Sequence, residues 1–520
     1  MSIEKKSFLK RTGRFSAATI ISRMLGLLRE ASLAAVFGAT GGMDAFVAAF
    51  RIPNLLRDLF AEGALSAAYI PVFTEKLKRE GTRKALLITS SIFSIILAIL
   101  GLIVILGIVL APYFVRYYVS GFDDPDQVDL TIKLARIMFP FILLVAFAAV
   151  SMGTLNSLGR FGIPALAPAV FNLIMIVSAL YLTRFMHPPI IALGIGAVAG
   201  GVGQFVIQIP QLIKVGFKFR FKMDFKDESV RRIFKLMLPA ALGVAAWQVN
   251  VVVSTLLASY LEAGSISNLY YALRLVHFPL GVFGVALAAV SLPEVSALVS
   301  SGDIKGAAEA QRYSSKMVLF LLMPSAAYLM GAAEAIVSAA YQRGSFAWTD
   351  TLGVAVALRA YALGLVFFGL VRVTAQVFYA FKDTITPVKI SLITVAVNVA
   401  LSLLFLRPLG FAGLALATSL SSVVNFSFLY YLSGRKAPRP DRFGLAPYFA
   451  KMLLCSLLSG FAAYLVARSF QSADGFGGFG RAMTATVLSA LAAGITFFLT
   501  CSILKIKELT HIKEMFSGRR

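Results

Sequence analysis

The sequence has few charged side chains for its length. Only 14% of its 520 residues are Asp, Glu, Lys or Arg, whereas 58% are hydrophobic, and the mean hydropathy is +0.82. A soluble globule of this composition would have to expose large apolar patches to water. We therefore predict an all-α, polytopic membrane protein.

Cysteine and histidine are also scarce. The chain has two cysteines, Cys455 and Cys501, which lie far apart within apolar runs, and three scattered histidines. Neither set has the spacing of a metal or redox motif, so we expect buried, inert thiols and no metal site. The sequence shows no nucleotide-binding loop and no catalytic cluster, which argues against a primary pump and against an enzyme.

Acidic residues are about half as numerous as basic ones. The chain has 25 Asp and Glu against 49 Lys and Arg, for a net charge of +24. The basic residues fall mainly in short loops between apolar segments, where the positive-inside rule and anionic lipid explain them, so we expect no nucleic-acid partner. The loops after the second, sixth, eighth and twelfth apolar segments are basic, and the loop after the third is acidic. Both termini are therefore predicted to be cytoplasmic.

Apolar runs of about 20 residues are long enough to cross the roughly 30 Å hydrocarbon core of a bilayer. Fourteen segments are predicted to do so, although charges and prolines dilute the signal of the first two and of the eighth. The segments are 15–37, 43–72, 85–115, 131–154, 162–184, 189–213, 232–261, 266–297, 313–341, 353–381, 386–406, 410–433, 446–469 and 482–504.

Three landmarks recur along the chain at almost the same offset. The pairs are Pro164 with Pro387 and Arg51 with Arg274, both 223 apart, and Pro71 with Pro293, 222 apart. Six segments separate the copies, so both halves keep the same orientation, as in a parallel transporter repeat. We predict an N-terminal lobe at 1–214, a C-terminal lobe at 215–435, and two additional helices with a basic tail at 436–520.

Charged residues interrupt the first two apolar segments. They are Arg23, Arg29, Glu30, Asp44, Arg51, Arg57 and Glu62. A charge at the bilayer centre costs at least about 2.5–3.5 kcal/mol, so these side chains are expected to face a water-filled cavity. Four cations against three acids indicate a cavity that binds an anion. The alternative is a set of structural ion pairs, such as Arg29 with Glu62 or Arg51 with Asp44.

Arg274 adds a cation from the second half of the chain. A guanidinium offers a bidentate fork to phosphate or carboxylate oxygens and keeps its charge at any working pH. Asn54 and Ser267 could add neutral hydrogen-bond donors. The alternative for Arg274 is snorkelling to the membrane interface. Arg359 and Arg372 are weaker candidates, for which snorkelling or a local ion pair is an equal explanation.

Motifs along essentially the whole chain resemble the MurJ (MviN) family of lipid II flippases, in the multidrug/oligosaccharidyl-lipid/polysaccharide exporter superfamily. They are Ser22-Arg23 through Gly26 and Arg29, Asp44-Ala45-Phe46, Pro53-Asn54-Leu55-Leu56-Arg57, Ala61-Glu62-Gly63, Tyr270-Tyr271 with Arg274, Asn156 with Arg160-Phe161 and Pro164, and Thr386-Pro387-Val388-Lys389. The resemblance implies substrate-binding roles for Arg23, Arg29, Arg57 and Arg274, and implicates Asp44. The sequence departs from the family's pattern at two positions. Glu30 occupies a position where many members have Asp, and His277 occupies one where an acidic residue can follow the cavity arginine.

The resemblance implies two six-helix lobes in a V, a cationic cavity for a diphosphate headgroup, and a groove beside the last two helices for an undecaprenyl tail. It implies a monomer in the bacterial cytoplasmic (inner) membrane that translocates lipid II beside the cell-wall synthesis enzymes. No cofactor is expected, and a monovalent cation or the membrane potential would drive the cycle. An ion-coupled drug or small-molecule antiporter is the alternative on the same fold, but intramembrane acids should then dominate. A glycolipid polymerase or ligase would need a catalytic base and long extracytoplasmic loops.

Overall fold

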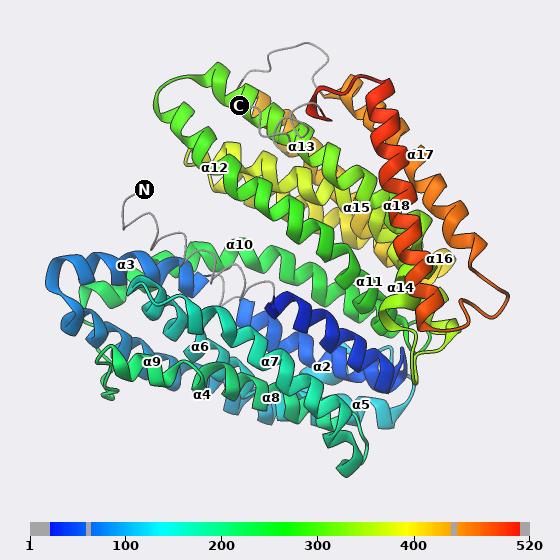
Figure 1. The fold of residues 1–520 in the computed structure, drawn as a ribbon. Coiled ribbons are helices and arrows are strands. Elements are labelled where there is room, and N and C mark those ends of the chain that lie inside the picture. Colours follow the sequence, from blue (N-terminus) through cyan, green and yellow to red (C-terminus); the bar gives the residue numbers. More distant parts are fainter. Residues whose placement is uncertain (1–20, 59–63, 438–444, 510–520) are drawn as a thin grey trace. The chain divides into compact units, whose positions relative to one another are not determined.

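The computed structural model describes residues 21–58, 64–437 and 445–509, and the regular elements of these residues are helices (Figure 1). The chain divides into two compact units, Met1–Gly264 and Ser265–Arg520. Ten helical segments of the described residues are long and apolar enough to cross a membrane. The predicted all-α membrane class is confirmed. The total of fourteen spans stays a prediction, because the first two predicted segments run into residues outside the described ranges.

The first unit begins with a helix at 21–37 and continues through helices that follow one another closely. They are α2 (Gly41–Arg57), α3 (Ala64–Glu80), α4 (Thr82–Tyr118), α5 (Pro125–Met138), α6 (Phe141–Ser157), α7 (Gly162–Leu180), the 3-10 turn η2 (Leu182–Phe185), α8 (Ile191–Val206), α9 (Ile209–Lys214) and α10 (Glu228–Ser259). The N-terminus of α2 is capped by Thr40, whose hydroxyl accepts a hydrogen bond from the Met43 amide at 3.4 Å.

Glycines let α8 approach α7 closely, as small residues do between membrane helices. A Cβ at Gly200 would lie 2.6 Å from the ring of Phe171, and one at Gly196 would lie 2.6 Å from the side chain of Ser178. The space left by Gly200 therefore fixes the Phe171 ring, which in turn packs against Phe141 with 5.6 Å between ring centroids. The Phe171 ring also lies beside Arg29, one of the predicted site residues.

The contacts of α10 place it in the first unit, where it packs against α3 and α4. The boundary between the compact units thus falls after Gly264, whereas the sequence repeat assigns the same helix to the second lobe. The lobe limits at residues 214 and 435 remain predictions.

The second unit is also built from helices. They are α11 (Ser265–Pro279), the π-helical turn η3 (Leu280–Gly284), α12 (Val285–Ser300), α13 (Ile304–Gly331), α14 (Ala333–Tyr341), α15 (Trp348–Ala380), α16 (Ile385–Lys436), α17 (Ala446–Ser469) and α18 (Phe479–Ile503). The π-turn follows Pro279, which lacks the amide proton that a regular helix would use.

The 52 residues of α16 form two antiparallel halves. Gly410 breaks the helix with φ 54° and ψ −137°. Asn398 donates to the hydroxyl of Thr418 at 3.3 Å and to that of Ser421 at 3.2 Å. Twenty residues of a straight helix would span about 30 Å, so these contacts require the chain to turn back near Gly410. The predicted division between the segments 386–406 and 410–433 is confirmed at this point.

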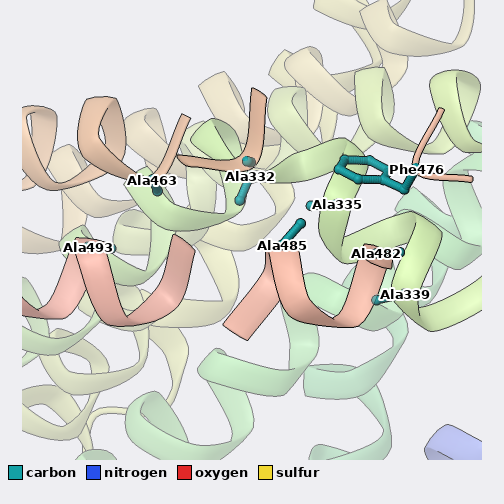
Figure 2. Close-up of a cluster of buried hydrophobic side chains, with 9 residues drawn as sticks. Ala332, Ala335, Ala339, Ala463, Phe476, Ala482, Ala485 and Ala493 are labelled. Atoms are coloured by element: carbon teal, nitrogen blue, oxygen red, sulfur yellow. The ribbon is translucent and has the colours of Figure 1, made fainter. Parts of the chain in front are cut away.

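The last two helices pack against α13 and α14 through small side chains. Figure 2 shows the buried cluster, in which a single aromatic ring, Phe476, lies among alanines of α14, α17 and α18 and Ala332, the residue between α13 and α14. The alanines are Ala332, Ala335, Ala339, Ala463, Ala467, Ala482, Ala485 and Ala493. Short side chains permit close backbone approach, and a Cβ at Gly331 would lie only 2.2 Å from the carbonyl oxygen of Gly460.

Candidate functional site

The Arg29 side chain is held from three sides within the first unit. Its Nη1 donates to Asn172 Oδ1 at 2.9 Å, and its Nη2 donates to the carboxylate of Glu30. The guanidinium carbon lies 5.7 Å from the centroid of the Phe171 ring. Asn172 also donates to the Ser22 carbonyl at 3.1 Å, which ties α7 to the helix at 21–37. The Arg29 side chain is 15% exposed.

The pairing with Glu30 bears on the alternative of structural ion pairs. Glu30 is buried, with 2% of its surface exposed, and it adjoins Arg29 in sequence. An ion pair is therefore present at Arg29, but its partner is the neighbouring residue. The pairing with Glu62 raised from the sequence lies outside the described residues.

Asp44 lies in the first turn of α2, where the positive end of the helix dipole favours a carboxylate. It is 1% exposed, and its Oδ2 accepts a hydrogen bond from the Gly264 amide at 2.6 Å. Arg51, two turns further along α2, donates to the Thr255 hydroxyl of α10. In the described part of the chain Arg51 makes no ion pair, so the pair of Arg51 with Asp44 is not formed.

At the end of α2, an acidic side chain bonds to the neighbouring arginine and to a side-chain amide of α10. Arg57 donates to Asp58 Oδ1 through Nε at 3.1 Å and Nη2 at 2.9 Å, while Gln248 of α10 donates to Asp58 Oδ2 at 2.8 Å. Both charged side chains are about one-third exposed or less, at 27% and 33%. Asn54, one turn earlier, has a buried side-chain oxygen that accepts no hydrogen bond from any described residue.

Arg23 differs from the other arginines of this unit because its side chain is exposed. It has no ion pair with the described residues. Its guanidinium is therefore the most accessible of the predicted cations in the helix at 21–37.

Basic groups cluster in the second unit around α11. Arg274 donates to the Tyr270 hydroxyl at 3.3 Å, and its guanidinium carbon lies 4.8 Å from the centroid of that ring. His277, one turn further along, is close enough to interact electrostatically with Arg274 and with Arg372 of α15. Ser267 is fully buried in the first turn of α11.

Arg359 forms a local ion pair, which is one of the two explanations that the sequence leaves open for this residue. Its Nη2 contacts the Glu334 carboxylate, and its Nε donates to the Met330 carbonyl at 3.2 Å. Arg372 is exposed and has no such acid partner among the described residues.

The sequence did not single out the neutral residues that bond to these charged side chains. Asn172, Gln248 and Thr255 each contact a charged side chain of the first two helices. The available signal for such partners was a side-chain amide within an apolar segment. Amides are uncharged, and many serve only to hold helices together. Among the described residues no group of three side chains could hold a metal ion.

Comparison with known families decides the identity. A family model described as "Lipid II flippase MurJ" matches residues 33–479. The chain belongs to the MurJ family. A "Probable lipid II flippase MurJ" of Vibrio cholerae is 38% identical over 433 residues, 82% of each chain. Its counterpart in Haemophilus influenzae is 35% identical over 464 residues, 86% of this chain and 90% of that one.

Solved structures agree with this assignment. The structure titled "Lipid II flippase MurJ, inward closed conformation" matches with a TM-score of 0.79 and 28% identity, and it covers 94% of this chain and 98% of the other. An inward-facing multidrug resistance MATE transporter matches with a TM-score of 0.66 at 15% identity, covering 82% of this chain and 98% of that one, which shows a shared fold. This MurJ-family chain is thus a multi-pass protein of the inner membrane.

Proposed function

We propose that this protein moves lipid II, the undecaprenyl-diphosphate-linked disaccharide-peptide, from the inner to the outer leaflet of the membrane by alternating access. Such a substrate must carry its charged head through hydrocarbon while its tail stays in lipid, so it needs a hydrated path with cations. No covalent bond is made or broken, and the protein acts as a transporter. Membership of the MurJ family supports this function.

The observation that carries the proposal is the incomplete neutralisation of arginines in the first two helices. Within the described part of the first unit, Arg51 bonds to a neutral hydroxyl and Arg23 has no acid partner. Asp44 meanwhile receives the Gly264 amide. A purely structural network would gain nothing from surplus cations, because each unpaired charge is costly in this environment. A diphosphate provides the missing negative charge.

We assign substrate binding to six side chains, and cavity charge or ion pairing to four others. The substrate ligands proposed are Arg23, Arg29, Asn54, Arg57, Ser267 and Arg274. The side chains proposed to set the charge of the cavity, alone or in ion pairs, are Glu30, Asp44, Arg51 and Glu62. The Arg29 guanidinium is bonded to Asn172 and Glu30, and phosphate oxygens would replace one of these partners when the substrate binds. Arg359 receives no such role, because it lies outside the motifs that resemble the family and is bonded to Glu334 and a backbone carbonyl.

The energy source belongs to the same proposal. A monovalent cation or the membrane potential would drive the cycle, without a cofactor. An inside-negative potential favours outward movement of an anion by about 2.3 kcal/mol per charge at 100 mV. Surplus cations that return without substrate would move in the opposite, also favourable, direction.

Three further points are proposed with the function. Both termini lie in the cytoplasm, the undecaprenyl tail follows a groove beside α17 and α18, and the protein works as a monomer beside cell-wall synthesis enzymes. The outer faces of these two helices support the second point, since they carry exposed apolar side chains such as Leu457 and Leu491.

Depletion of the protein in its native cells, followed by labelling of lipid II from outside the membrane, tests the function. We expect lipid II to accumulate in the inner leaflet, and re-expression of the intact chain to restore outside labelling. Re-expression of the double variant Arg359→Ala with Glu334→Gln is the matched control. It removes an ion pair that lies outside the proposed binding residues, and it should restore outside labelling as the intact chain does. Undiminished outside labelling during depletion would refute the proposed function.

A further inference from the structure

The segment that links α9 to α10 alternates apolar and basic side chains. The apolar members are Phe217, Phe219, Phe221, Met223 and Phe225. The basic members are Lys218, Arg220, Lys222 and Lys226. An extended backbone directs alternate side chains to opposite faces, so this spacing separates an aromatic face from a cationic one.

The backbone of this segment is attached to α4. The Ser90 hydroxyl donates to the Arg220 carbonyl at 2.8 Å and lies 2.7 Å from the Arg220 amide, and the Lys222 amide donates to Ser94 at 3.0 Å. Two residues of extended chain advance about 6.7 Å, close to the roughly 6 Å that four residues of helix advance. The matching distances hold the segment extended along α4.

An apolar pocket of about 400 Å³ opens under the aromatic face. Phe93 of α4 lines the pocket, and its ring centroid lies 5.5 Å from that of Phe217, 6.5 Å from that of Phe219, and 5.1 Å from that of Phe147. The remaining lining comes from α8, α9 and the exposed side chain of Leu97. The pocket therefore belongs wholly to the first unit, and none of the intramembrane arginines lines it.

The cations of the segment have little to neutralise them. Lys218, Arg220 and Lys226 are exposed and make no ion pair with any residue that the structure describes. Lys222 alone is paired, with Asp224 at 2.7 Å. The segment also exposes aromatic rings beside these cations. Phe219, for example, is 51% exposed and lies at the rim of the pocket.

From this arrangement we propose a binding site for an anionic phospholipid of the surrounding bilayer. One acyl chain enters the apolar pocket between α4 and the linking segment. The headgroup phosphate lies at the edge of the segment, where the long side chains of Lys218 and Arg220 can reach it. Aromatic and basic side chains together suit the boundary between headgroups and acyl chains. The polyprenyl diphosphate of the substrate shares this chemistry. The separation of the pocket from the intramembrane arginines favours a resident phospholipid.

The test is a titration of the purified full-length protein in neutral detergent. The ligand is phosphatidylglycerol with a fluorescent label on an acyl chain, at the end far from the headgroup. We expect saturable binding, weaker binding of phosphatidylcholine by about ten-fold or more, and little binding of a short-chain phosphatidylglycerol that cannot fill the pocket. The variant K218Q/R220Q should lose about ten- to thirty-fold in affinity, because each cation near an anionic lipid contributes about a five-fold change.

Two matched controls separate the site from general effects. K78Q/R83Q removes the same charge from exposed, unpaired positions of the same unit and should bind as the intact chain does. Phe219→Ser changes the pocket rim and should weaken binding several-fold, whereas Phe221→Ser, on a ring outside the pocket, should not. Equal loss in the variants and their controls would overturn the proposal. So would displacement by inorganic phosphate alone, or binding of polyprenyl phosphate in place of phosphatidylglycerol.

Discussion

Gly159 and Lys382 lie 223 residues apart and share one backbone conformation, with φ of 75° and 58°. Each follows the end of a helix, α6 or α15. The next amide in each copy returns to the helix in the same way, since Arg160 donates to the Leu155 carbonyl and Asp383 to the Phe378 carbonyl, both at 2.8 Å. The helices that follow start at Gly162 and Ile385, again at the same offset. The repeat read from the sequence thus includes the end of one helix and the start of the next.

Lys382 adopts a left-handed conformation that its Cβ disfavours and that glycine adopts freely. The substitution Lys382→Gly should therefore stabilise the protein by up to about 1 kcal/mol, and Gly159→Ala should destabilise it by about 1 kcal/mol. Thermal unfolding in detergent would measure both. If Gly159→Ala left the midpoint unchanged, the shared conformation would be unimportant for stability.

Asp383 links the two ends of α16, because it accepts hydrogen bonds from Thr386 at the start and pairs with Lys436 at the end. Burial opposes its ionisation, but the Thr386 amide and hydroxyl and the Lys436 ammonium outweigh that effect and lower the pKa of Asp383 from 3.8 to about 2. A depressed carboxylate pKa stabilises the fold above pH 4, and this contribution disappears as pH falls through about 2.

The Asp383→Asn variant should therefore be less stable than the intact protein at pH 7, and the difference should shrink between pH 4 and pH 2. Lys436→Gln should reproduce part of the loss, because it removes one of the groups that hold the carboxylate ionised. Midpoints of thermal unfolding measured across this pH range would check both variants. A gap that stays constant down to pH 2 would contradict the assignment.

Gly331 tests the close packing of α17 against α13. A methyl group there would meet the Gly460 carbonyl oxygen at 2.2 Å, and neither backbone can move without disturbing the alanine cluster of Figure 2. We expect Gly331→Ala to destabilise the protein by about 1–3 kcal/mol. Gly494→Ala on α18 is the control, since nothing lies within 4 Å of its added methyl group. Similar unfolding midpoints for the two variants would show that the interface tolerates displacement.

Arg29→Ala tests the substrate site. Charge-assisted hydrogen bonds contribute about 1.5–3 kcal/mol each, so lipid II translocation should fall roughly ten- to a hundred-fold. Arg29→Lys keeps the charge without the fork and should recover only part of the activity. The double variant Arg29→Ala with Glu30→Gln removes the acid that the first change strands. It should regain stability at most, and recovery of transport would identify Arg29 as an ion-pair partner only.

Orientation can be tested with introduced cysteines, because Cys455 and Cys501 are buried. Cysteines at the exposed positions Asp126 and Ala263 should react with an impermeant reagent from outside the cell. A cysteine at Lys78 should react only after the membrane is opened. Labelling of the Lys78 position in intact cells would reverse the predicted orientation.

The sequence carried most of the fold because hydropathy reports membrane burial directly. It also located the turn in α16, where Leu406 to Gly410 interrupts the apolar run. It could not choose partners for the charged side chains. Arg29 was rotated away from Glu30 on an ideal helix, yet the length of its side chain lets the two meet. Contacts with Asn172 and Thr255 depend on which neutral residues face the helix after packing, and charge patterns do not encode that choice.

The contact between Arg29 and Asn172 has a consequence for biosynthesis. The two residues are 143 positions apart, so at roughly 5–20 residues per second the amide is made about 7–30 s after the arginine. Throughout that interval a guanidinium in an apolar segment lacks one of its final partners. Glu30 is synthesised next to it and can pair with it immediately. A carboxylate adjacent in sequence thus protects the nascent first helix while the rest of its bundle has yet to be translated.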